Sequence, residues 1–482
     1  TIMATEMSAS RLLAPFFGNS LFIWTNLIGL ILIYLTAGYF LGGKLADRRP
    51  EAGLLYKITM AAAVTIAVLP FIARPVMGIA IEGIAEISAG AFLGSFGVTI
   101  LLFALPVTLL GMVSPFAIRL RTTSVETAGN VAGGIYALST VGSILGTFLP
   151  VLLLIPWLGT RNTMLLFAGT LAAVSALGLV QGGGSRLYAG APLLIAAALA
   201  VPQGAIKPEP LSIFETESPY HYIQVIERSG TRYLKLNEGW AVHSIYDPDE
   251  ILTGAYWDYF LLAPWFAADE SPQRALNIGS AAGTIARQLI HYYPHIGVDA
   301  VEIDPEVVEV GRDYFAMDDP ALTVYVADGR PFLRLNKARY DLIAIDAYRQ
   351  PYIPFYLTTR EFFQDVYDHL DDRGAIMINV GKVPGDDAIA EAIGTTMRSV
   401  FPSVYSFPGG TFNQMLVATR SPSTPGDLVA RSGSMPPDVA GMADDVAGSL
   451  TVVQPGGTIL TDDKAPVEWL TDQMIINYAR GQ

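Results

Sequence analysis

The chain has 482 residues, of which 51% are hydrophobic, and its formal net charge is −14. A chain of this length is expected to form at least two domains, and its acidic balance argues against nucleic acid as a partner. It contains no cysteine, which excludes disulfides and thiolate chemistry.

Hydropathy and charge both divide the chain near residue 205. Residues 1–206 carry 10 Lys and Arg and 6 Asp and Glu, whereas residues 207–482 carry 20 and 38. The first part contains apolar runs long enough to cross a bilayer. We therefore predict a multi-span α-helical membrane domain over 1–205, with the lipid bilayer as a partner. The expected spans are about 21–42, 55–73, 91–113, 130–157 and 163–181, with a shorter run at about 187–202.

The chain begins with a pattern that does not resemble a signal peptide. Residues 1–14 lack the basic start and long apolar run that such a peptide needs, and they look like the end of a helix. We therefore expect an earlier membrane span to precede this numbering or to have been removed.

A linker and a small subdomain are expected after the membrane domain, over 206–265. Residues 203–212 are rich in proline, and short strands at 222–227 and 233–237 are followed by a turn at Glu238-Gly239. This pattern predicts a small β-hairpin subdomain. The aromatic segment 256–266 is expected to be an amphipathic helix, and residues 266–482 are assigned to an α/β domain.

Four strand ends within residues 274–346 carry the chemistry. Polar groups at the carboxyl ends of parallel strands fall in one crevice, where open α/β sheets bind ligands. The pattern therefore predicts a Rossmann-type nucleoside-binding unit. The expected strands are 274–278, followed by a turn from Gly279 to Gly283; 297–303, ending in Glu302 and Ile303; 323–327, followed by Asp328-Gly329; and 340–345, followed by Asp346.

These positions suit an adenosine site with an acid beside it. One carboxylate, Glu302, is placed to accept two ribose hydroxyl hydrogens, and a second, Asp328, to accept the amine of the base. Asp346 could accept a proton from an attacking amine or hold that amine in place. Glu302 and Asp328 could each instead cap a helix or form a loop salt bridge. Asp462, near the end of the chain, is expected to cap the last helix.

The order of these elements resembles the spermidine synthase (aminopropyltransferase) family, and specifically its membrane-fused members. Ser218 and Tyr220 match the family's opening serine and tyrosine, and residues 234–239 resemble its Leu-x-Leu-(Asp/Asn)-Gly strand with one residue inserted. Over about 213–420 the resemblance implies a hairpin subdomain and a methyltransferase-like sheet. It also implies Glu302 at the ribose, Asp328-Gly329 at the adenine and Asp346 as the catalytic aspartate.

The sequence departs from this family at the residues that bind amines. The family's aspartate for the aminopropyl ammonium is replaced by Ala282 (or Ala281), and its second acceptor-binding aspartate by Arg349. The resemblance therefore implies that the nucleoside half of the site is kept and the amine half is changed. The candidate substrate-binding residues are Tyr220, His221, His243, Asp258, Tyr348, Arg349 and Tyr352.

Three functions follow as hypotheses. The first is a transferase that moves an aminopropyl or related alkyl group from decarboxylated S-adenosylmethionine or S-adenosylmethionine to a small-molecule amine, without a metal. The second is a methyl- or alkyltransferase that acts on a lipid or membrane-soluble acceptor, which Arg349 would suit if that acceptor is anionic. The third is a transporter or sensor with a non-catalytic nucleoside-binding domain. The sequence leaves a homo-oligomer open.

The side of the membrane on which the catalytic domain lies depends on residues 187–202. The positive-inside bias places the basic loops around residues 44–57 and 119–121 in the cytoplasm. If all six runs cross the membrane, the acidic domain is outside, where adenosyl donors are not made. Because this last run is short and contains two prolines, we expect it to lie along the surface, which leaves the catalytic domain cytoplasmic.

Overall fold

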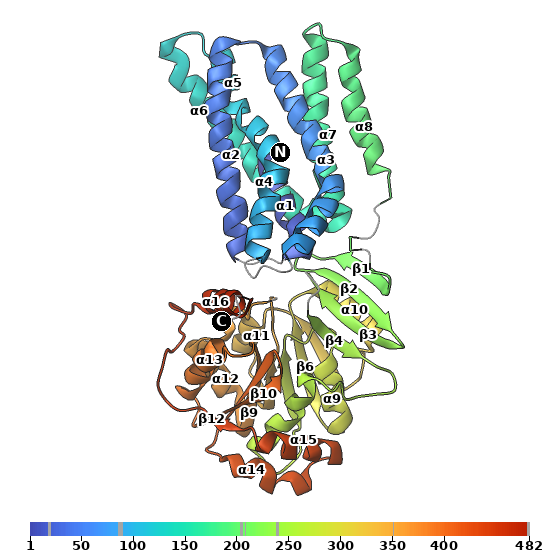
Figure 1. Cartoon of the computed structure of the whole chain (residues 1–482), viewed down its shortest axis with the longest axis vertical. Helices are drawn as coiled ribbons and strands as arrows, with labels where there is room; N and C mark the ends of the chain where they lie inside the picture. Colours follow the sequence, from blue (N-terminus) through green and yellow to red (C-terminus); the bar gives the residue numbers. More distant parts are fainter. Residues whose placement is uncertain are drawn as a thin grey trace. The chain divides into compact units, whose positions relative to one another are not determined.

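A computed structural model describes residues 1–17, 21–84, 90–202, 206–207, 209–237, 241–349 and 351–479. The chain forms two compact units, Thr1–Pro208 and Glu209–Gln482 (Figure 1). The turn expected at Glu238-Gly239 lies outside the described residues. Each unit is described separately below.

The first unit is a helical bundle. Among its described residues, four helical stretches are long and apolar enough to cross a membrane: 23–48, 52–73, 96–121 and 125–181. The last one contains both spans expected at 130–157 and 163–181, because the helix continues between them and bends at Gly159 (φ 77°). The helices are α1 (Ile2–Phe17), α2 (Leu21–Arg48), α3 (Ala52–Ile84), α4 (Gly90–Gly111), α5 (Val113–Arg121), α6 (Val125–Leu149), the π-helix η1 (Pro150–Leu154), α7 (Ile155–Gln181), the 3₁₀ helix η2 (Arg186–Ala189) and α8 (Gly190–Leu199).

Glycines allow two of these helices to pack closely. A Cβ on Gly38 of α2 would lie 2.3 Å from the Thr108 carbonyl oxygen of α4, and one on Gly42 would lie 2.6 Å from the Met112 Cα. Only a residue without a side chain fits at such distances, as in other close helix pairs in membranes. The small residues of α2 therefore serve helix packing.

The second unit starts with a four-stranded antiparallel sheet in the order β1-β2-β3-β4. Its two middle strands, β2 and β3, correspond to the predicted hairpin, whereas the outer strands β1 and β4 were not expected. Side chains of β2 and β3 pack on Val307 and Val310 of α10 (Pro305–Phe315), which attaches this sheet to the rest of the unit. The strands are β1 (Ser212–Glu217), β2 (Tyr222–Arg228), β3 (Thr231–Leu236) and β4 (Val242–Tyr246).

A mixed eight-stranded sheet follows, in the order β12-β10-β11-β9-β8-β5-β6-β7. Strands β9, β8, β5, β6 and β7 are parallel, whereas β11, β10 and β12 extend the sheet as antiparallel strands. Its strands are β5 (Arg274–Ile278), β6 (Gly297–Glu302), β7 (Leu322–Val326), β8 (Tyr340–Ile345), β9 (Leu370–Gly381), β10 (Ser403–Gly410), β11 (Asn413–Thr419) and β12 (Thr451–Val452).

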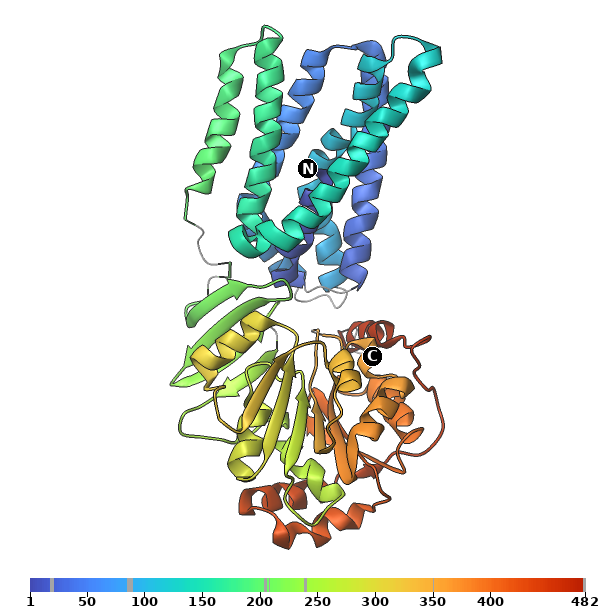
Figure 2. The same ribbon diagram turned by 180° about the vertical axis from the view of Figure 1, so that it is seen from behind.

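Helices cover both faces of this sheet, and each face has its own apolar core (Figure 2). Within β5, Leu276 and Ile278 face one core, while Ala275 faces the other. The first core is closed by α11 (Gly329–Leu335), α12 (Arg360–His369), α13 (Ala388–Arg398) and α16 (Val467–Ala479), and the second by η3 (Tyr256–Phe266), α9 (Thr284–Tyr292), α14 (Pro425–Ala430) and α15 (Pro437–Ala447). The unit is therefore a Rossmann-like fold of the methyltransferase type.

The aromatic segment 256–266 differs from its expected form. It is a 3₁₀ helix, η3, rather than an amphipathic α-helix, and nine of its 11 residues are buried. Because it packs between the sheet and the helices α9, α14 and α15, it has no face exposed to solvent. It brings Tyr256 and Trp257 to the carboxyl ends of the strands.

Candidate functional site

The turn after β5 is fixed by three residues with positive φ. Gly279 (φ 78°), Ala281 (φ 46°) and Gly283 (φ 87°) reverse the chain before α9 begins at Thr284. A Cβ on Gly279 would lie 2.5 Å from the Ala347 Cα, so only glycine fits there. This contact brings the turn against the end of β8, where Asp346 lies.

Glu302, at the end of β6, lies directly beneath this turn. Its Oε2 accepts the N–H of Ala281 at 3.0 Å and its Oε1 accepts the N–H of Asp304 at 3.1 Å. Burial raises the pKa of Glu302, and the nearby His221 opposes that rise. Each carboxylate oxygen keeps a lone pair for a further donor, so the geometry suits a pair of vicinal hydroxyls. Ile303 separates Glu302 from Asp304 and is half-buried.

The loop between β1 and β2 is tied to the same strand end. Asp304 is fully buried and accepts hydrogen bonds from the Ser218 hydroxyl at 2.5 Å and from the Glu306 N–H at 3.0 Å. His221 Nδ1 lies 2.8 Å from the Asp304 carboxylate. The contact with Asp304 thus holds His221 near Glu302. Tyr220, its neighbour, is 39% exposed and is available to a ligand.

Asp328 follows β7 and caps α11. Its Oδ1 accepts the Arg330 N–H at 3.1 Å, and its Oδ2 accepts the Tyr356 hydroxyl at 2.9 Å. A Cβ on Gly329 would lie 2.4 Å from the Ile278 side chain, so glycine is needed for α11 to approach β5. Asp328 is therefore a helix cap at the expected strand end, and its contact with the base stays a prediction.

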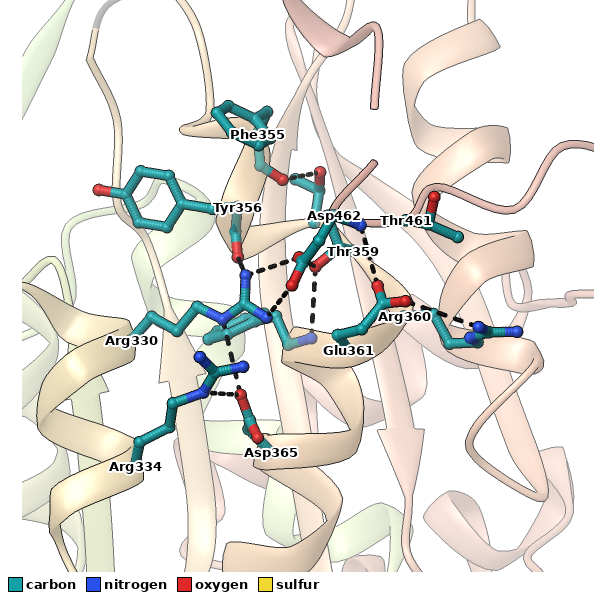
Figure 3. Close-up of polar contacts among 12 residues, drawn as sticks. Arg330, Arg334, Phe355, Tyr356, Thr359, Arg360, Glu361, Asp365, Thr461 and Asp462 are labelled. Atoms are coloured by element: carbon teal, nitrogen blue, oxygen red, sulfur yellow. Dashed lines mark hydrogen bonds and ion pairs between the residues drawn. The ribbon is translucent and has the colours of Figure 1, made fainter. Parts of the chain in front are cut away.

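A buried arginine connects this strand end to the C-terminal part of the chain (Figure 3). Arg330 donates two hydrogen bonds to Asp462, at 2.7 and 2.8 Å, and a third to the Tyr356 carbonyl. Asp462 also accepts from the Thr359 hydroxyl. It was expected to cap the last helix, but its carboxylate is engaged by these groups and α16 begins only at Val467. The contact fixes the segment that presents the Tyr356 hydroxyl to Asp328.

Asp346, after β8, is surrounded by hydrogen-bond donors. Its Oδ1 accepts from Asn379 Nδ2 at 2.9 Å, and its Oδ2 accepts from the Tyr256 hydroxyl at 3.0 Å and Trp257 Nε1 at 3.1 Å. Burial raises the pKa of Asp346 to about 6, against the lowering effect of these three donors. A carboxylate with such a pKa can exchange a proton near neutral pH, as a general base must.

The segment after Asp346 is fixed by two tyrosines. The Tyr348 hydroxyl donates to the Asn379 carbonyl at 3.1 Å and accepts the Gly381 N–H at 2.6 Å. The Tyr352 hydroxyl donates to Asp472 of α16 at 2.6 Å. Between them Arg349 pairs with Tyr352 through the backbone and leaves its side chain exposed. Gln350, in this segment, lies outside the described residues.

Two further candidates lie in supporting positions. Asp258, on η3, accepts hydrogen bonds from Thr253, Gly254 and Gln288, so its carboxylate organises the 253–255 loop. His243, on β4, is half-buried and precedes Ser244, whose hydroxyl accepts the Ala282 N–H at 2.9 Å. Among the residues that the structure describes, no cluster of His, Asp or Glu is arranged to hold a metal ion.

The sequence analysis missed the three donors to Asp346 and the Tyr356 hydroxyl. Asn379 had a detectable signal, because it is a polar residue near the carboxyl end of the apolar strand 375–380, at the same sheet edge as the three predicted acids. Tyr256 and Trp257 adjoin Asp258, which was selected instead. Tyr356 lies four residues beyond the candidate Tyr352 and was not selected.

A glycine turn over one buried acid, with other acids at successive strand ends, is the arrangement typical of Rossmann-type domains that bind nucleosides. A family model described as "Spermine/spermidine synthase domain" matches residues 263–412. The polyamine aminopropyltransferase of Vibrio vulnificus is 30% identical over 202 residues, which cover 40% of this chain and 67% of that protein. The chain belongs to the spermidine synthase (polyamine aminopropyltransferase) family.

A second relative and one solved structure are also similar to this chain. A probable polyamine aminopropyl transferase of Bifidobacterium longum is 34% identical over 293 residues, covering 55% of this chain and 64% of that protein, so slightly less than two thirds of its length is matched. The spermidine synthase of Thermotoga maritima is 20% identical with a TM-score of 0.40, covering 48% of this chain and 83% of that one. The fold assignment rests on the strand order given above.

Proposed function

We propose that the chain is a membrane-anchored transferase that moves an aminopropyl or related alkyl group from an adenosyl sulfonium donor to an amine. The donor is decarboxylated S-adenosylmethionine or S-adenosylmethionine, with the ribose on Glu302, the base near Asp328 and the backbone of Gly279 and Gly283 alongside. The four apolar helical stretches of the first unit support membrane anchoring.

The chemistry needs one nucleophile and one proton acceptor. The neutral amine nitrogen attacks the carbon attached to the sulfonium, the carbon–sulfur bond breaks, and its electron pair neutralises the sulfur as a thioether. The proton released by the new ammonium passes to Asp346. The single observation that carries this proposal is the Asp346 carboxylate at the strand end that adjoins the glycine turn. Burial raises the pKa of this carboxylate to about 6.

The nucleoside product identifies the reaction. Purified protein is incubated with each donor and an amine, and the product is identified by mass spectrometry. Methylthioadenosine from the decarboxylated donor indicates aminopropyl transfer, whereas S-adenosylhomocysteine indicates methyl transfer. If neither product forms although the nucleoside still binds, the result would support a non-catalytic sensor and contradict the proposal.

A methyl- or alkyltransferase acting on a lipid or membrane-soluble acceptor is the second candidate, and one observation favours it. Ala282, in place of the family's aspartate, is 2% exposed and packs in the core between the small sheet and α10. The turn thus offers no fixed negative charge from that position. A carboxylate on the donor would meet less repulsion, and repulsive groups often decide specificity.

We predict that a carboxylate at position 281, the more exposed neighbour of Ala282, introduces discrimination between the donors. Ala281 is half-exposed with φ 46°, a conformation that Asp and Asn tolerate better than other residues. Ala281→Asp should raise the kcat/KM ratio of decarboxylated to full S-adenosylmethionine about tenfold, equivalent to ~1.4 kcal/mol. Ala281→Asn has the same shape without the charge and is the matched control. Equal ratios in the two variants would show that the donor's end does not approach this turn.

The pH dependence of turnover should reflect the protonation of the Asp346 carboxylate. Because the pKa of Asp346 is raised to about 6, the carboxylate is charged above that pH and protonated below it. Turnover should therefore fall as pH drops through about 6. Tyr256→Phe removes a hydrogen bond that lowers this pKa, so the midpoint should move upward relative to the unaltered protein, while titration of the acceptor amine affects both alike. An unmoved midpoint would assign the acid limb to another group.

A further inference from the structure

Three connections of the first unit share one end of the bundle, which we name the basic end (residues 44–57, 119–126 and 182–186). Arg119 of α5 forms an ion pair with Asp47 of α2 at 3.1 Å. A Cβ on Gly178, near the end of α7, would lie 2.3 Å from the ring of Tyr56 in the first turns of α3. Seven of the 10 basic residues before Lys207 lie here: Lys44, Arg48, Arg49, Lys57, Arg119, Arg121 and Arg186.

From the basic end, the chain turns back and α8 packs against α7. The two helices lie side by side in both views (Figure 1, Figure 2). The Gly184 N–H donates to the Leu179 carbonyl at 2.8 Å. Farther along, a Cβ on Gly169 would lie 3.4 Å from Ile195. From residue 179 to residue 161, α7 rises about 27 Å, close to the ~30 Å of a bilayer's hydrocarbon core.

Arg161 fixes the far end of this pair. It is 8% exposed, and it donates to the Ala198 carbonyl at 2.9 Å and to the Val201 carbonyl at 3.0 Å. Its guanidinium lies 4.9 Å from the Phe71 ring centroid of α3. A charge in such a setting needs partners, and here they are one carbonyl in the last turn of α8 and one just beyond its end. The end of α8 therefore lies at the opposite end of the bundle from residues 182–186.

A second contact places the linker at the same end. The Lys207 ammonium lies 5.5 Å from the ring centroid of Phe16, in the last turn of α1. The chain passes from α1 to the start of α2, and α2 then runs 28 residues to the basic end. Residue 207 is therefore separated from the basic end by the length of α2, about 42 Å.

We infer that α8 crosses the membrane completely, so that the catalytic unit lies on the opposite side of the membrane from the basic end. Basic loops remain in the cytoplasm, and the unit beginning at Glu209 then faces the other compartment. The cytoplasmic placement expected from sequence required residues 187–202 to lie along the surface, whereas the register of α8 on α7 favours a crossing.

This topology determines where the substrates come from, and that part of the inference rests on the proposed function. A transferase facing away from the cytoplasm must receive its adenosyl donor from a transport or release step, since such donors are made inside cells. Its amine acceptor would be one that occurs outside the cytoplasm or at the outer membrane surface. The nucleoside product would also leave the reaction on that side.

Because the chain has no cysteine, single engineered cysteines provide a direct test. Glu51→Cys lies in the exposed loop of the basic end, and Asp444→Cys lies on the exposed face of α15 in the catalytic unit. Protoplasts making each full-length variant are treated with a membrane-impermeant maleimide before and after lysis. We expect Asp444→Cys to be labelled in intact protoplasts and Glu51→Cys only after lysis.

Every other labelling pattern would overturn the inference. Labelling of both cysteines only after lysis would place the catalytic unit in the cytoplasm, and labelling of only Glu51→Cys before lysis would reverse the orientation. Labelling of both in intact protoplasts would place both ends of the bundle outside. Assay of the nucleoside product in detergent-solubilised protein does not depend on sidedness, so a wrong topology and a wrong activity are distinguishable.

Discussion

Asp346→Asn should lower kcat by roughly 10²–10⁴, the range for a positioned acid–base group, while nucleoside binding persists. The substitution removes the charge that accepts the amine proton but keeps the shape of the side chain. Because Asn379, Tyr256 and Trp257 all donate to this carboxylate, the new amide also places one N–H group against a donor. Single-turnover kinetics with saturating donor, together with calorimetric titration of methylthioadenosine, separate turnover from binding.

The same strand provides a matched control. Asp341 is at the other end of β8, where its Oδ2 accepts the N–H groups of Gln273 and Arg274 at 2.7 and 3.0 Å. Asp341→Asn makes the same chemical change far from the turn, and it should leave kcat within about twofold. Normal turnover in Asp346→Asn, or joint loss of folding and nucleoside binding, would mean that Asp346 is structural.

The strands that carry the site could be predicted because each is a short apolar run ending at a glycine or an acid. The expected strands at 274–278 and 340–345 have the bounds of β5 and β8. The three donors to Asp346 were harder to find, since two come from η3, about 90 residues earlier in the chain, and one from β9. Local pattern gives a side chain's position on a strand, but such distant partners depend on tertiary packing.

Other differences also come from long-range contacts. Asp462 has the local pattern of a helix cap, yet Arg330, 132 positions earlier, binds it. The two spans expected around residue 160 form one helical stretch, because apolar composition alone does not show where a helix ends. The tilt and register of α8 likewise depend on Arg161 and on packing against α7, which composition does not encode.

Glu302→Gln should weaken nucleoside binding about ten- to hundredfold. The loss of a charge-assisted hydrogen bond costs roughly 1.5–3 kcal/mol, which corresponds to that range. In this variant one amide N–H would also face the Ala281 or Asp304 N–H that the carboxylate now accepts. Asp328→Asn should cost less, because the asparagine Oδ1 can still cap α11, while its Nδ2 can donate to the Tyr356 hydroxyl oxygen in place of the bond that Asp328 now accepts.

Glu306→Gln is the matched control for this prediction, since it makes the same substitution four residues later, in the first turn of α10. Calorimetry with methylthioadenosine measures all three variants, and circular dichroism shows whether each is folded. The control should bind as the unaltered protein does, whereas Glu302→Gln should not. The geometry points to this result because Glu302 is the only side chain in the described residues whose carboxylate accepts the Ala281 N–H. Equal affinity in Glu302→Gln and the control would show that the ribose binds elsewhere.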